Sequence, residues 1–132
     1  MELIAISPFV EDNPDFRRVL WTGEHTQLVA MTLQPGEDIG TEVHRENDQI
    51  LSFLKGSGEA ILDGRKLAVA PGDVLMVPAG AEHNITNTGP EPLLLYTIYG
   101  PPDHAPDTVH RTKQDAEAAE AAGEDQPPQQ SG

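Results

Sequence analysis

Turn residues cut the chain into short runs of alternating apolar and polar residues, and this spacing limits the fold more than any other feature. Gln27 to Leu33 alternates and stops at Pro35-Gly36, as a strand followed by a turn does. Asp63-Gly64 separates two later runs and predicts a two-residue hairpin, since both central positions of that turn need positive φ. Further predicted strands cover 41–45, 48–54, 58–62, 66–69, 74–77, 82–86 and 93–99. Short strands at this spacing indicate an all-β antiparallel barrel or jelly roll.

The segment after the strands has a different composition. Thr112 to Asp115 resembles a capping arrangement ahead of an Ala- and Glu-rich run that ends at Gly123, which predicts a short exposed C-terminal helix. The last residues are rich in Gln and Pro and are expected to be disordered. We therefore divide the chain into an N-terminal arm (1–26), a β-barrel with its following loop (27–111), an exposed helix (112–123) and a disordered tail (124–132).

The N-terminal arm carries apolar residues that would be costly to leave in water. Phe16, Leu20 and Trp21 are the largest of them, and we expect one or two short strands packed on the barrel or on a second subunit. A barrel this small offers the arm no evident partner. Exchange of an arm strand with a second copy would cover it, so the sequence predicts a homodimer.

Composition excludes several functional classes. A chain of 132 residues is one domain by its length, and its net charge of −14 would repel a nucleic-acid backbone. The absence of cysteine excludes disulfides, thiolate ligands and cysteine nucleophiles. The N-terminus shows neither a signal peptide nor a membrane-spanning run, so we expect a soluble, cytoplasmic protein without nucleic-acid or membrane partners.

Four side chains with metal-binding atoms lie on neighbouring predicted strands. Alternation places Glu42 and His44 on one face of a strand, Gln49 opens the next strand, and His83 lies on a later one. Two imidazoles, a carboxylate and an amide oxygen suit a divalent ion such as Fe, Mn, Ni, Co or Zn. The sequence therefore predicts one metal site with the ligands Glu42, His44, Gln49 and His83.

The same two stretches resemble the paired motifs of the cupin superfamily of small β-barrels. The first family motif has the same spacing as this chain has from Gly36 to Gly56: five residues separate Gly36 from Glu42, one separates Glu42 from His44, four separate His44 from Gln49, and six separate Gln49 from Gly56. Glu42 and Gln49 stand where the family has His and Glu. The second motif matches in full at Gly72, Pro78, Gly80, His83 and Asn87. The resemblance implies a single-domain bacterial cupin that binds a small molecule, and the chain end after the last strand is similar to cupins loosely described as mannose-6-phosphate isomerase-like.

Other residues are assigned by their place in the predicted strands. If Gln49 faces inward, Leu51 and Phe53 do so too, and Ile85 joins them from the His83 strand. Tyr96 and Tyr99 lie on opposite faces of one strand, so at most one reaches the cavity, and we assign Tyr96 to it. Asn87 is expected to support the fold or the metal ligands. The three remaining histidines, His25, His104 and His110, are expected to be polar surface.

Several alternatives remain open. The glycines and Pro78 serve turns with or without a metal, so the motif could survive as scaffold around a cavity filled by side chains. Gln49 can ligate directly or hydrogen-bond to a ligand. The favoured function is a metal-dependent oxygenase or isomerase acting on a small organic molecule, and the alternative is a non-catalytic ligand-binding or sensing cupin.

Overall fold

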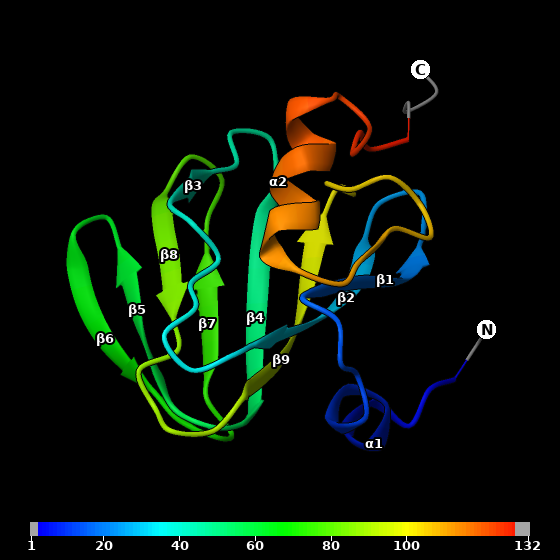
Figure 1. Cartoon of the computed structure of the whole chain (residues 1–132). Helices are drawn as coiled ribbons and strands as arrows, with labels where there is room; N and C mark the ends of the chain where they lie inside the picture. The colour runs from blue at the N-terminus through cyan, green and yellow to red at the C-terminus, as the bar shows by residue number, and fades with distance from the viewer. Residues whose placement is uncertain (1–2, 129–132) are drawn as a thin grey trace.

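The computed structural model describes residues 3–128, and in them the chain forms ten strands and two helices (Figure 1). In chain order these are α1 (Ile6–Glu11), β1 (Arg17–Thr22), β2 (Gln27–Leu33), β3 (Glu42–Val43), β4 (Asp48–Lys55), β5 (Gly58–Leu62), β6 (Arg65–Val69), β7 (Val74–Val77), β8 (Glu82–Thr86), β9 (Leu93–Gly100), β10 (Val109–His110) and α2 (Lys113–Ala121). The prediction of an all-β antiparallel fold with a short C-terminal helix is confirmed.

The strands form two antiparallel sheets that face each other across the main core. One sheet has the order β10-β1-β2-β9-β4-β7, and the other has the order β3-β8-β5-β6. Leu51 and Phe53 of β4 and Ile85 of β8 are fully buried between the sheets. The predicted Asp63-Gly64 hairpin joins β5 to β6, with φ of 47° and 82° at its two central residues.

A smaller apolar cluster covers the outer face of the larger sheet. Val10 of α1, Ala30 of β2 and Leu94 of β9 form it, and Tyr96 packs against it. Because α1 covers this face, β9 is apolar on both sides at its N-terminal end. The strand alternates so that Leu95, Thr97 and Tyr99 point to the main core while Leu94 and Tyr96 point away from it.

The N-terminal arm differs from the expectation for residues 1–26. It begins with a helix, α1, where only strands were expected, and its strand β1 pairs with both β2 and β10 of the same chain. Phe16 and Val19 are buried in the main core. Leu20 packs against the smaller cluster, whereas Trp21 is 46% exposed. Most of the apolar surface that suggested strand exchange is therefore covered within the chain, and the homodimer stays a prediction.

The C-terminal part lies at the end of the molecule where β3 is found (Figure 1). The cap predicted for the helix is confirmed, since the Thr112 hydroxyl oxygen accepts a hydrogen bond from the Asp115 amide at 3.1 Å. The prediction of a disordered tail is wrong at Asp125. Its side chain is 6% exposed, forms an ion pair with His104 and accepts a hydrogen bond from the Ala105 amide. Residues 129–132 of that tail, like residues 1–2 of the arm, lie outside the described part of the chain. Neither helix of the described chain is long and apolar enough to cross a membrane.

Candidate metal centre

Two adjacent strands of the smaller sheet bring the predicted ligands together. In the β3–β8 pair, Glu42 lies opposite His83, and His44 follows directly after β3. One ligand atom from each of these three residues lies within 4.8 Å of the other two. The ring centroids of the two histidines are 5.3 Å apart. This is the spacing that a single ion bound by all three side chains requires.

His83 is oriented and uncharged, as a ligand must be. Its Nδ1 lies 3.2 Å from the carbonyl oxygen of Ala81. A carbonyl only accepts hydrogen bonds, so Nδ1 carries the proton and Nε2 keeps its lone pair. Burial lowers the pKa of His83, because the charged form is less favourable away from water. The neutral imidazole therefore prevails at neutral pH, with Nε2 free to bind a cation.

His44 lies between two carboxylates. Its Nδ1 is 3.4 Å from Asp103 Oδ1, and its Nε2 is 2.8 Å from Glu42 Oε2 without hydrogen-bond geometry. Burial opposes the charged imidazole, but the carboxylates of Asp103 and Glu42 outweigh it and raise the pKa of His44 to about 9. The position between Glu42 and His83 thus favours positive charge, which a proton supplies in the absence of an ion.

Gln49 presents an unpaired oxygen inside the barrel. It is 3% exposed, and its Nε2 donates to the Thr97 hydroxyl at 3.0 Å. Its Oε1 is buried and has no hydrogen-bond partner in the described chain. A buried amide oxygen left unpaired is costly, whereas a divalent ion would satisfy it. The buried Oε1 of Gln49, which lacks a partner in the described chain, and the close approach of Glu42 to His44 make this ligand set fit a metal.

A network of charged residues next to the ligands was not found from the sequence. Asp103 contacts His44 on one side and His104 Nε2 at 3.5 Å on the other, and His104 Nδ1 is 2.7 Å from Asp125 Oδ2. The expectation that His104 and His110 are surface residues is wrong, since they are 5% and 7% exposed. No local pattern marks these residues, because they come from the loop after β9 and from the tail.

Tyr99, rather than Tyr96, lies beside the metal ligands. The Tyr99 ring is 5.6 Å from that of His44 and 5.2 Å from that of His104, in edge-on arrangements. Tyr96 lies on the other face of β9, against the cluster under α1, so its assignment to the cavity is wrong. Burial keeps the pKa of the Tyr99 hydroxyl well above its ordinary value, which leaves it a neutral hydrogen-bonding group.

Asn87 supports the fold and not the ligands. It is 1% exposed, and its Nδ2 donates to the carbonyl oxygens of Leu33 and Glu91 at 2.9 and 2.8 Å. Its Oδ1 accepts from the Gly89 amide at 2.9 Å. The side chain therefore links the turn after β8 to the end of β2, with its amide nitrogen and its oxygen both hydrogen-bonded.

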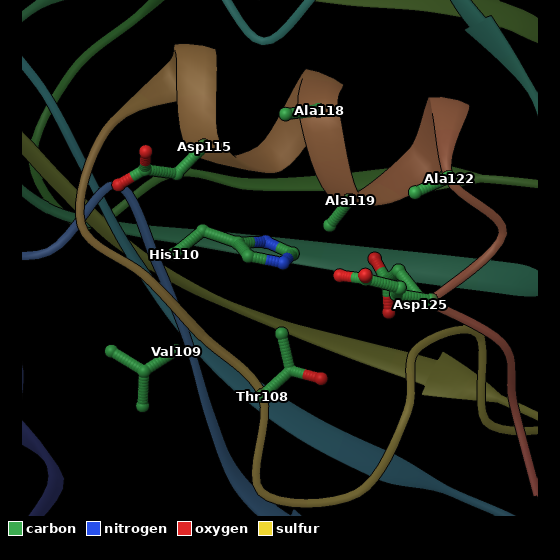
Figure 2. Close-up of a pocket in the computed structure, with 9 residues that line it drawn as sticks. Thr108, Val109, His110, Asp115, Ala118, Ala119, Ala122 and Asp125 are labelled. Carbon is green, nitrogen blue, oxygen red and sulfur yellow. The ribbon is translucent and has the colours of Figure 1, made fainter.

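Two of the proposed ligands, Glu42 and His44, line a polar cavity of about 430 Å³. Glu42 and His44 form one wall, and Glu120 of α2 together with the 125–127 segment forms another. Arg17 of β1 also lines this cavity. A second groove of about 500 Å³ lies beneath α2, where Figure 2 shows His110 between the helix and the strands, with Asp125 at its far end. Asp125 lines both spaces.

Comparison with known proteins agrees with this architecture. The chain is 44% identical over 124 residues to YrkC of Bacillus subtilis, which covers 89% of this chain and 67% of that relative. The crystal structure of BH2720 from Bacillus halodurans superposes with a TM-score of 0.87 at 42% identity, covering 89% of this chain and 93% of that one. An oxalate-binding protein of Thermotoga maritima is 34% identical over 59 residues, which are 45% of this chain and 49% of that protein. The chain thus spans about two thirds of YrkC and half of the Thermotoga protein. A family model described as a cupin domain matches residues 29–99, so the chain belongs to the cupin superfamily.

Proposed function

We propose that this cupin binds one divalent transition-metal ion through Glu42, His44 and His83, with Gln49 as the fourth ligand. The observation that carries the proposal is the convergence of three ligand atoms within 4.8 Å. The unpaired Oε1 of Gln49 supports its place in the set. Two histidines and one carboxylate with further positions open are typical of ions that also bind a small molecule.

The surrounding residues would prepare the site before an ion arrives. The Ala81 carbonyl holds His83 with Nε2 unprotonated, and Asp103 accepts from His44 Nδ1 so that Nε2 faces Glu42. Such partners fix ring orientation and raise ligand basicity. When bound, the ion would supply Lewis acidity and a docking point for oxygen donors. The cavity walls then decide which molecules reach it.

We propose that the site serves an enzyme, a metal-dependent oxygenase or isomerase acting on a small organic molecule. The cavity of about 430 Å³ is of the size that holds a small ligand. The similarity to an oxalate-binding protein supports a ligand that contributes oxygen atoms. Tyr99, whose ring lies next to that of His44, would provide a neutral hydroxyl beside the bound molecule.

A non-catalytic binding or sensing module is the second candidate. In the described chain, Asp103, His104 and Asp125 are paired with one another and with His44. This pairing leaves none of them free to carry a proton to or from a bound molecule, which favours binding without reaction. Liquid chromatography with mass spectrometry, applied to pyruvate incubated with the metal-loaded protein and oxygen, separates the two candidates. An oxygenated product differs in mass and an isomer differs in retention time, whereas unchanged pyruvate supports the second candidate.

Elemental analysis of protein purified without a histidine tag tests the metal proposal. We expect about one equivalent of a divalent metal in the wild type and loss of it in His83→Ala. His25→Ala is the matched control, since the side chain of His25 is 84% exposed and is not part of the group of converging ligand atoms. A wild type that takes up no metal after incubation with each of Fe, Mn, Ni, Co and Zn would refute the proposal.

A further inference from the structure

A buried arginine enters the cavity from the first strand. Arg17 is 6% exposed and lines the same space as Glu42 and His44. It lies on β1, opposite His110 of β10 and Met31 of β2, on the face that points toward the barrel interior. Its guanidinium carbon is 5.3 Å from the centre of the Phe16 ring, so the planar group is supported by an aromatic face.

Arg17 has no ion-pair partner in the part of the chain that the structure describes. No carboxylate oxygen of residues 3–128 lies within 4.0 Å of its nitrogens, and its Nε is buried without a hydrogen-bond partner. A buried charge without a paired group is costly. An arginine with a purely structural role is usually paired with a carboxylate. Several carboxylates line the same cavity, yet none of them lies within ion-pair distance of Arg17.

We propose that Arg17 binds the carboxylate of the molecule that occupies the metal site, so that the ligands of this cupin are small metal-chelating carboxylic acids. The proposal rests on the metal site proposed above. The guanidinium fork matches the two oxygens of a carboxylate. A second oxygen of the same molecule, such as the keto group of a 2-oxo acid, would then reach the ion from the same cavity.

The charges of the cavity favour a carboxylate over a phosphate. Among the described residues that line the cavity, Arg17 is the one that carries a guanidinium, while Glu42, Asp103, Glu120 and Asp125 contribute carboxylates. A divalent ion and Arg17 together offset the added charge of a monoacid. A doubly charged phosphate group would meet more repulsion, and the cavity provides none of the several cationic donors that phosphate sites use.

Arg17 also has a simpler role open to it, which is to offset the neighbouring acids. Its charge contributes to lowering the pKa of Glu42, Asp103 and Asp125. That role predicts an effect of Arg17 on metal uptake or stability, with no preference for anions among ligands of the ion. Comparison of an anionic and a neutral ligand of the same ion separates the two roles.

The test uses the full chain loaded with Co(II), whose visible absorption reports ligands that enter the coordination sphere. Pyruvate is the carboxylate probe, imidazole is the neutral probe, and inorganic phosphate is the competing anion. The variants are Arg17→Gln and Arg17→Lys, with Arg18→Gln as the matched control because Arg18 is the exposed neighbour on the same strand. Cobalt content and thermal unfolding are measured for each.

We expect Arg17→Gln to bind pyruvate about 10- to 100-fold more weakly, the loss of a charge-assisted hydrogen-bonded pair, while its affinity for imidazole and its cobalt content match the wild type. Arg17→Lys keeps the charge without the fork and should lie between the two. Equal pyruvate affinity in wild type and Arg17→Gln overturns the inference, as does tighter binding of phosphate than of pyruvate by the wild type. If Arg17→Gln does not fold, equal pyruvate affinity in wild type and Arg17→Lys overturns it. A wild type that takes up no cobalt would refute the proposed metal site. A cobalt-loaded protein whose pyruvate affinity does not depend on Arg17 would refute only the role of Arg17.

Discussion

Replacing Asn87 by alanine tests whether the last residue of the second motif acts on the fold or on the metal. The side chain makes three hydrogen bonds to backbone groups at 2.8 to 2.9 Å, and it is 1% exposed. Each buried hydrogen bond contributes about 0.5 to 1.5 kcal/mol, and the abandoned carbonyls of Leu33 and Glu91 lose their donor. We therefore expect Asn87→Ala to lower the free energy of unfolding by about 2 to 4 kcal/mol.

Urea denaturation followed by circular dichroism measures this change. With a slope of about 2 kcal/mol per molar urea, the midpoint should fall by about 1 to 2 M. Asn84→Ala is the matched control, since Asn84 also lies on β8 but makes two part-buried bonds, to Asp38 and from the Gly40 amide. A smaller loss is expected there.

Metal content decides the interpretation. Because the side-chain hydrogen bonds of Asn87 go to backbone groups, folded Asn87→Ala should hold as much metal as the wild type. A variant with the wild-type urea midpoint but without bound metal would refute this reasoning. Asn87 would then act on the metal ligands.

Three further predictions concern the protonation of the site, a turn and the tail. The pKa of His44 is raised from its ordinary 6.5 to about 9. In metal-free protein this group therefore contributes stability that is present below pH 6.5 and is lost as the pH rises to about 9. Urea titrations across that range should show this loss in the wild type and not in His44→Gln. Gly56→Ala should cost more than Gly64→Ala, although both have φ above 80°, because an added Cβ at Gly56 would lie 2.5 Å from a backbone oxygen while none lies within 4 Å at Gly64; thermal unfolding compares them. Asp125→Ala should lower the free energy of unfolding by about 1 to 3 kcal/mol through its lost bonds to His104 and Ala105 and make the tail sensitive to proteases, and a tail as resistant as that of the wild type would contradict this.

The prediction for Tyr96 failed for a reason that local patterning cannot remove. Alternation correctly places Tyr96 and Tyr99 on opposite faces of β9. Which face is interior is undetermined, because Leu93, Leu94 and Leu95 are apolar on both faces. The packing of α1 on the outer face explains this pattern. Helix α1 was not predicted from the sequence because residues 6–11 carry only a weak helical signal.

The sequence by itself determined the antiparallel fold and the spacing of the proposed ligands. Turn residues and period-two alternation are local properties. They set the limits of the strands and place Glu42 and His44 on one face of a strand, with Gln49 and His83 on neighbouring strands. The tertiary structure decided everything that depends on contacts between distant segments. Three such features come from a loop, the tail and the first strand: Asp103 beside His44, Asp125 in the cavity lining, and Arg17 without an ion-pair partner among residues 3–128. Their roles follow from burial and distance, which no local pattern encodes.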